Sequence, residues 1–354
     1  MNKSYSAINQ WPEDGLEDVL SCPVCGSRER TLIFDGLFDR LYGAPGVWKL
    51  QQCLSCKSAY LDPRPTPETI GLTYQHYFTH DSAANAEVVK ENKNYLGLLF
   101  QGLRNGYLFH RYHAKLYPSI SWGAFIVEFI PVLRERANAW VKHLPPPTPG
   151  ATVLDVGCGN GAFLLQMQKL GWNVQGLEFD AKAAEAAQEN GIPVVVGSLD
   201  WNTFPQSSFD AIVLNHVVEH LPYPRETIKI CYHLLKPGGI ISISTPNFDS
   251  IGRHAYKQNW LHLHPPAHLT IFTTRSLVKM LRDEGYQDVK ARHSFGSSSY
   301  LSASQELKNE SRGINRSSAK ERIILSFYKF LASLASYFNP FLCEEAVVTA
   351  SKQI

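Results

Sequence analysis

Short apolar runs alternate with helix-compatible segments through the second half of the chain. The runs have the length and composition of buried strands and occupy residues 152–156, 173–178, 193–196, 211–215, 240–244, 287–294 and 345–350. Helical segments separate them, the first at residues 162–170. Such an alternation folds with right-handed crossovers into a doubly wound parallel sheet. We therefore expect an α/β domain over residues 151–354.

The first predicted strand ends in a glycine-rich turn, VLDVGCGNG at residues 153–161. Glycine tolerates positive φ and has no side chain, so the turn can bring its backbone against a nucleoside. The amides at the start of the following helix face the same ligand. Gly157, Gly159 and Ala162 also match the loose fingerprint of dinucleotide enzymes. The turn alone predicts a nucleoside cofactor and leaves its kind open.

Glu178 ends the second predicted strand, seventeen positions beyond Gly161. A carboxylate at this point can accept hydrogen bonds from both ribose hydroxyls. That placement suits a nicotinamide dinucleotide and an adenosyl cofactor equally.

Three later segments distinguish the two cofactors. They read FDAIVLNHVVEHL at residues 209–221, LLKPGGI at 234–240 and STPN at 244–247. In this order and spacing they resemble the motifs of class I S-adenosylmethionine-dependent methyltransferases, from about Ala151 to the C-terminus. The resemblance implies a mainly parallel seven-stranded sheet, S-adenosyl-L-methionine as cofactor, and a methyltransferase activity.

The resemblance also implies cofactor-binding roles. The methionine part would meet Asp155, Gly157, Gly159 and Gly161; the ribose would meet Glu178; the adenine would meet Phe179 and the segment around Leu199; and Asn215 would lie beside the sulfonium. Many family members carry Gly-Asp after the third strand, whereas this chain has its acid displaced to Asp200. The sequence therefore does not decide which side chain contacts the adenine amine.

Methyl transfer to a hydroxyl needs the acceptor held in line, and a general base assists it. His216, Glu219 and His220 follow the fourth predicted strand at the mouth of the cleft, and imidazole titrates near neutral pH. Quinone-precursor O-methyltransferases resemble this segment but carry Glu at the position of His216, forming a Glu-x-x-Glu-His metal-binding pattern. The alternative is that Glu219 and His220 only hold the loop in place.

A second histidine group lies at residues 259–272 and predicts a lid over the acceptor pocket. Its tryptophan and its Pro-x-x-His-x-x-x-Phe pattern resemble the lid of bacterial methyltransferases that act on sugars. His268 is therefore a further candidate base. The alternative is a hydrogen bond that only holds the lid.

Two Cys-x-x-Cys pairs near the N-terminus predict a structural zinc site. The pairs are Cys22 with Cys25 and Cys53 with Cys56, and each lies in residues that favour turns. Four thiolates complete a tetrahedral zinc shell and leave no position for a substrate, so the ion would stabilise the fold without chemistry. Reduced thiols without metal are the alternative.

The ribbon is followed by Asp-Pro-Arg-Pro at residues 62–65 and by a predicted helix over residues 67–78, with Thr66 as its N-cap. This order, with Tyr74 and Tyr77 in the helix, again resembles methyltransferases of sugars and small metabolites. An aromatic and basic stretch at residues 95–143 predicts helices that cover the cofactor cleft. We expect a zinc-ribbon-like module at 1–62, a helical linker at 63–150 and the methyltransferase domain at 151–354.

The balance of charged residues in the composition argues against nucleic acid as a binding partner. Lysine and arginine number 34 against 32 acidic residues in 354, so no overall basic field favours nucleic acid. The polar N-terminus lacks a secretory pattern, and the seven cysteines do not suit a disulfide framework, so we expect a cytoplasmic protein. The apolar segment 322–342 is a candidate contact with a membrane surface or another subunit, unless it packs against residues 95–143.

The sequence thus predicts transfer of a methyl group from S-adenosyl-L-methionine to a small polar acceptor. An oxygen of a sugar, glycan precursor or related metabolite fits best. A quinone precursor, an RNA gripped by the zinc ribbon, and a scaffold that binds the cofactor without turnover are the alternatives.

Overall fold

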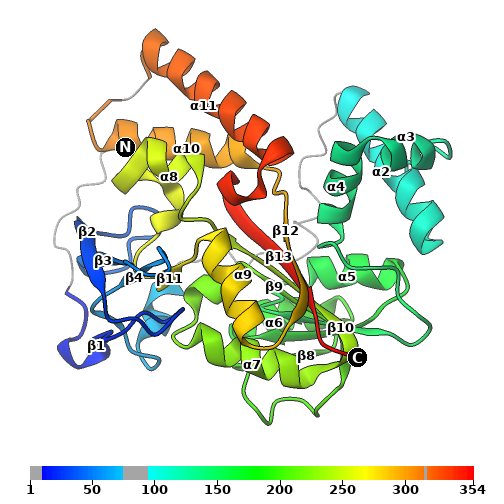
Figure 1. Cartoon of the computed structure of the whole chain (residues 1–354), viewed down its shortest axis with the longest axis horizontal. Coiled ribbons are helices and arrows are strands. Elements are labelled where there is room, and N and C mark those ends of the chain that lie inside the picture. Colours follow the sequence, from blue (N-terminus) through cyan, green and yellow to red (C-terminus); the bar gives the residue numbers. More distant parts are fainter. Residues whose placement is uncertain (1–9, 75–94, 315–316) are drawn as a thin grey trace.

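A seven-stranded sheet forms the centre of the protein, as the computed structural model shows for the residues it describes, 10–74, 95–314 and 317–354 (Figure 1). The strands are β6 (Thr152–Val156), β7 (Asn173–Glu178), β8 (Val194–Val196), β9 (Phe209–Asn215), β10 (Leu235–Pro246), β12 (Gln287–Arg292) and β13 (Glu345–Ser351). Their order is β12-β13-β10-β9-β6-β7-β8. Strands β6 to β10 run parallel, and β13 is antiparallel to both of its neighbours. The predicted doubly wound, mainly parallel sheet is confirmed.

Helices cover both faces of the sheet because successive side chains of a buried strand point to opposite sides. On β6, Val153 packs into one apolar cluster and Leu154 into another. The Val153 cluster holds helices α2 (Tyr95–Tyr112), α3 (Gly123–Phe129), α4 (Pro131–Trp140), α5 (Ala162–Lys169) and α6 (Ala181–Glu189). The Leu154 cluster holds α7 (Pro224–Leu234) and α9 (Thr274–Asp283). The helices at 95–143 thus pack directly on the seven-stranded sheet.

The N-terminal residues form a second, antiparallel sheet, which stands beside the first (Figure 1). It contains β2 (Arg30–Leu37), β3 (Trp48–Cys53), β4 (Ala59–Leu61) and β11 (Thr270–Ile271). The fourth strand, β11, comes from the far end of the sequence. A short 3-10 helix, η1 (Glu13–Gly15), precedes β1 (Leu16–Glu17), which pairs with β5 (Arg64–Pro65).

The helix predicted after Thr66 is only partly described. Residues 70–74 form a 3-10 helix, η2 (Ile70–Tyr74), rather than the start of an α-helix. The Thr69 hydroxyl donates to Gly15 O at 2.8 Å, which ties this turn to η1. Residues 75–78, including Tyr77, lie outside the described residues.

The remaining helices of the described residues lie in the connections after β9, β10 and β12. They are η4 (Val218–His220), α8 (Ile251–Tyr256), η5 (Lys257–Asn259), η6 (Leu261–Leu263), α10 (Ser297–Glu310), α11 (Ala319–Phe338) and η7 (Pro340–Leu342). Helix α11 spans most of the apolar segment noted in the sequence. It packs through Leu325, Tyr328 and Ala332 on the cluster that includes Trp260, while Ile323, Phe327 and Phe330 stay exposed. Within the described residues, no helix combines the length and apolarity needed to cross a membrane.

Candidate functional site

The glycine turn and Glu178 form one cradle at the carboxyl ends of β6 and β7. Gly157, Gly159 and Gly161 have φ of 71°, 53° and 77°, a backbone region that L side chains rarely adopt. The amide of Gly159 donates to Glu178 Oε2 at 2.7 Å, and Asp180 N donates to Glu178 Oε1 at 2.9 Å. The carboxylate is thus fixed over the turn.

The cradle has open space for a ligand. A Cβ built on Gly159 would meet no atom within 4 Å. Beside Glu178, the Phe179 side chain is 60% exposed, which is unusual for a large aromatic residue next to a strand end. Leu199 packs partly against the core below. The residues present therefore fit an adenosine with its ribose on Glu178 and a ring beside Phe179.

Sequence reasoning missed Lys142, which reaches the cradle from the turn after α4. Its Nζ donates to Asn215 Oδ1 at 2.6 Å. Burial lowers the pKa of Lys142, while the charges of Glu345 and Asp155 act in the opposite direction. Burial also raises the pKa of Asp155 to about 7, against the effect of Lys142. No sequence motif marks Lys142, because its position in the site depends on how α4 packs against the sheet.

His216 is held between two carboxylates. Its Nδ1 lies 3.0 Å from Glu219 Oε1, and its Nε2 lies 2.8 Å from Glu345 Oε1. Burial alone would lower the pKa of His216, but the hydrogen bonds with the two glutamates outweigh it and raise the pKa to about 10. His216 also has φ of 55°. At neutral pH this side chain is an imidazolium whose two N–H groups are both used.

We call His216, Glu219 and Glu345 the clamp. Both of its carboxylates accept further hydrogen bonds. Glu219 is fully buried, and Thr245 Oγ1 donates to its Oε2 at 2.9 Å. Tyr300 OH donates to Glu345 Oε1 at 2.8 Å, and Ser294 Oγ donates to Glu345 Oε2. Burial would raise the pKa of Glu345, yet the hydrogen bond from His216 lowers it to about 2. The clamp therefore carries two negative charges and one positive charge.

The other two predicted histidines form a pair beside the clamp. The rings of His220 and His268 lie 4.8 Å apart, edge to face. His220 Nδ1 bonds to Ala267 O at 2.8 Å, and His268 Nδ1 bonds to His262 O at 2.7 Å. A carbonyl oxygen only accepts, so each Nδ1 carries a proton and Nε2 is the basic nitrogen of the neutral ring. Burial lowers the pKa of both.

The structure thus brings all four predicted catalytic residues together. Metal-ligating atoms of Glu219, His220 and His268 lie within 4.8 Å of one another. The site also contains His262 and Tyr300, which sequence reasoning did not assign to it. His262 stacks on His216 with an interplanar angle of 14°, and its buried Nε2 has no hydrogen-bond partner.

The four predicted cysteines form one cluster in the ribbon. Cys22 Sγ lies 3.6 Å from Cys56 Sγ, and Cys25 Sγ lies 3.6 Å from Cys53 Sγ. Four sulfurs around a tetrahedral zinc ion stand about 3.8 Å apart, so the cluster fits this ion. The hydrogen bond between Cys22 and Cys56 raises the pKa of Cys22 and lowers the pKa of Cys56 to about 5.

The two cysteine turns have matching backbone hydrogen bonds. Gly26 N donates to Cys22 O at 2.9 Å, and Lys57 N donates to Cys53 O at 3.0 Å. Both donors have positive φ, 76° and 63°. Equal geometry in two turns is what a single metal bound by both pairs needs.

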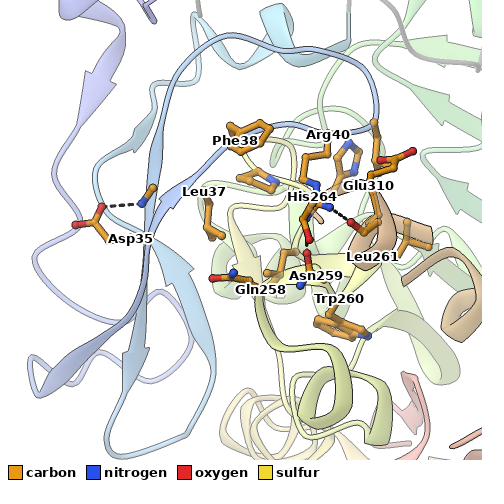
Figure 2. Close-up of a pocket in the computed structure, with 16 residues that line it drawn as sticks. Asp35, Leu37, Phe38, Arg40, Gln258, Asn259, Trp260, Leu261, His264 and Glu310 are labelled. Atoms are coloured by element: carbon orange, nitrogen blue, oxygen red, sulfur yellow. Dashed lines mark hydrogen bonds between the residues drawn. The ribbon is translucent and has the colours of Figure 1, made fainter. Parts of the chain in front are cut away.

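A cavity of about 240 Å³ lies where the ribbon meets the lid (Figure 2). Arg40, from the loop after β2, crosses it and donates to Asn259 Oδ1 at 2.8 Å and to Leu307 O. His264 lines the cavity and contacts His268, with ring centroids 5.1 Å apart. The lid histidines thus stand between this cavity and the clamp.

Comparison with known proteins agrees with the motifs. Residues 129–291 match a family model described as a methyltransferase domain. The ubiquinone biosynthesis O-methyltransferase of Albidiferax ferrireducens is 34% identical over 116 residues, which are 30% of this chain and 46% of that protein. The protein of the same name from Chromobacterium violaceum is 35% identical over 105 residues, 28% of this chain and 45% of its own. The matches therefore span about half of the length of these relatives.

Among solved structures, a SAM-dependent methyltransferase from Archaeoglobus fulgidus is 20% identical with a TM-score of 0.40, over 66% of this chain and 100% of that one. The phosphoethanolamine N-methyltransferase 2 of Haemonchus contortus is 15% identical with a TM-score of 0.41, over 83% of this chain and 63% of that one.

Proposed function

We propose that the chain, whose residues 129–291 match the methyltransferase domain model, transfers a methyl group from S-adenosyl-L-methionine to a small polar acceptor. The acceptor atom is an oxygen of a sugar, glycan precursor or related metabolite. One observation carries the proposal. The cradle of Gly159 and Glu178 follows β6 and β7, and His220, whose ring contacts His268, follows β9, the strand beside β6.

The cradle residues would hold the donor by its three parts. Glu178 accepts from the ribose hydroxyls and Phe179 covers the adenine. Lys142 is the cation nearest Asn215 among the contacts described above, and it binds the methionine carboxylate. When bound, S-adenosyl-L-methionine supplies an electrophilic methyl group on a cationic sulfur.

The charges around the clamp favour that cationic donor. His216 as an imidazolium with Glu219 and Glu345 as carboxylates leaves one net negative charge. In a partly buried site, Coulomb energies are several times those in water. The net charge of the clamp therefore favours the sulfonium donor over its neutral thioether product, and the nearby positive charge of Lys142 opposes this effect.

His220 is the base of this proposal. Its Nδ1–H is fixed on Ala267 O, so the neutral ring presents a basic Nε2. It takes the proton from the acceptor hydroxyl as that oxygen gains the methyl group. His216 cannot take this role at neutral pH because its pKa is raised to about 10. His216 and Glu219 instead hold the loop that carries His220, and His268 packs against the ring.

Transfer to a catechol-like quinone precursor is the second candidate. The names of the matched relatives and the closeness of Glu219, His220 and His268 favour it. In that case a divalent cation would sit among these three groups and bind the acceptor oxygens.

The test is incubation with S-adenosyl-L-methionine labelled in its methyl group and three acceptor sets. These are bacterial nucleotide-sugars with glycolipids, catechols with and without added divalent metal, and RNA. Label in the sugar set alone supports the proposal. Metal-dependent label in catechols supports the second candidate. Label in RNA, or no label in any set, contradicts both.

A further inference from the structure

The cysteine ribbon contacts the acceptor side of the site at three places. The first is a shared strand. Strand β11 lies at the end of the lid segment, and it pairs with β4 through Thr270 with Tyr60 and Ile271 with Ala59. Strand β3 ends at Cys53 and β4 begins three residues after Cys56, so the second cysteine pair connects two strands of the small sheet that the end of the lid joins.

A single residue, Leu269, connects this strand pairing to the loop that carries His220. Leu61 N in β4 donates to Leu269 O at 3.0 Å, and Leu269 N donates to Glu219 O at 2.8 Å. His268 precedes Leu269, and His220 follows Glu219. The ribbon strand therefore holds both members of the histidine pair through one residue between them.

The second contact comes from the Asp-Pro-Arg-Pro segment. Arg64 is 5% exposed, and its Nη1 donates to Pro222 O at 2.8 Å, two residues after His220. Its Nε also donates to Glu17 Oε1 at 2.7 Å, which ties the segment to β1. The third contact is that of Arg40 with Asn259 at the start of the lid (Figure 2).

The cysteine turns are themselves docked on the methyltransferase domain. Arg225 of α7 donates through two nitrogens to Val24 O, at 3.2 and 3.1 Å. Ser58 Oγ donates to Ser276 Oγ of α9 at 2.7 Å, and both residues are buried. Cys22, Val24 and Cys53 belong to a large apolar cluster that also holds residues of β6, β7, β9 and α9. A change in the turns is thus passed on to the elements around them.

The donor cradle is fixed by other means. Asp155 and Glu178 lie in the paired parallel strands β6 and β7, and the Glu178 carboxylate accepts from the amides of Gly159 and Asp180. These bonds do not involve the ribbon.

We propose that the metal-loaded ribbon is a positioning module for the acceptor side, in which the ion at the four cysteines fixes His220 and His268 without ordering the donor cradle. The inference rests on the proposed function for the meaning of these histidines. Metal loss would then loosen residues 262–272 and 216–222 and leave cofactor binding nearly intact.

Hydrogen exchange of the full chain tests this, with zinc-loaded protein compared with protein treated with a zinc chelator. Metal content is measured in parallel, and S-adenosylhomocysteine is the binding probe. We expect exchange at least tenfold faster in residues 262–272 and 216–222 after metal removal. Exchange in β6 and the dissociation constant of the probe should change by less than threefold.

Two outcomes overturn the inference. One is unchanged exchange in both segments after complete metal loss. The other is faster exchange in β6 as well, which would make the ion a stabiliser of the whole fold. If the zinc-loaded protein does not bind the probe, the proposed function is contradicted. The exchange measurement still decides whether the ion orders residues 262–272 and 216–222.

A variant that keeps all four cysteines provides a second test. Arg64→Gln removes the contact to Pro222 O and should speed exchange in residues 216–222 with metal content unchanged. Arg134→Gln is the control because it removes an exposed ion pair with Glu128, which joins α3 and α4 and has no contact with the ribbon among those named above. Equal exchange in the two variants would contradict the inference.

Discussion

His216 Nε2 lies 2.8 Å from Glu345 Oε1, although 129 positions separate the two residues in sequence. The contact joins the loop after β9 to the first residue of β13, which is antiparallel to β10 beside it. Together with Glu219 it raises the pKa of His216 to about 10, so we propose the neighbouring histidine pair as the site of proton transfer.

The first prediction concerns stability against pH. The pKa of His216 is raised from 6.5 to about 10, so its contribution is fully present below pH 6.5 and lost as pH rises through about 10. His216→Asn keeps a residue that tolerates positive φ but removes the charge. We expect the variant to lose about 3 to 5 kcal/mol of unfolding free energy at pH 6, because two buried carboxylates lose their partner.

Urea unfolding of both proteins between pH 6 and 10 measures this. The difference between wild type and His216→Asn should shrink across that range, by at most about 1.4 kcal/mol per pH unit. A difference that stays constant to pH 10 would show that His216 is not charged in the folded protein.

The second prediction concerns the space above the glycine turn. Gly159→Ala places a methyl group where nothing lies within 4 Å, so it should clash with the bound cofactor rather than with the protein. We expect at least a tenfold weaker affinity for S-adenosylhomocysteine. Gly191→Ala is the matched control, since Gly191 also has positive φ, 77°, and open space but lies between α6 and β8. Equal affinity in the two variants would refute the placement of the ligand.

The third prediction concerns Lys142. If its ammonium binds the methionine carboxylate, Lys142→Met should weaken S-adenosylhomocysteine about tenfold or more, as expected for a lost charge-assisted hydrogen bond. Binding of 5′-methylthioadenosine, which lacks the carboxylate, should change little. Lys182→Met, at an exposed position on α6, serves as control. If Lys142→Met weakened the affinity for both ligands equally, Lys142 would support the fold of the site and would not bind the carboxylate.

The fourth prediction concerns the base. Burial lowers the pKa of His220, so the rate with an accepted hydroxyl substrate should be flat at neutral pH and fall on an acidic limb centred below pH 6.5. His220→Gln should reduce kcat by about 10² to 10⁴, the usual contribution of general base catalysis. If His268→Gln lost as much kcat and His220→Gln kept the acidic limb of the pH profile, His268 would be the general base instead of His220.

The sequence signals for the predicted donor site are local, and the structure brings these residues together. Asp155 and Glu178 each end an apolar run, and parallel strands bring such ends to one edge. The strands expected at residues 152–156 and 173–178 have these bounds in the structure. The one expected at 240–244 is longer, because β10 continues from Leu235 through an irregular pairing to Pro246.

The acceptor side could be predicted only in part. Glu344 and Glu345 are adjacent, and their side chains point to opposite sides of the strand. Glu344 bonds to Gly252 N and Trp260 Nε1, whereas Glu345 bonds to His216. Only the strand register decides which of the two carboxylates faces the site. The pairing of β11 with β4 is likewise a contact over more than 200 positions and leaves no local pattern.

Calorimetric titration of the zinc-loaded protein with S-adenosylhomocysteine, beside NADH at the same concentrations, tests the central claim most directly. The account predicts one site per chain for S-adenosylhomocysteine, lost or strongly weakened in Gly159→Ala, and no binding of NADH. Binding of NADH without binding of S-adenosylhomocysteine would contradict it, and so would a site that Gly159→Ala leaves unchanged.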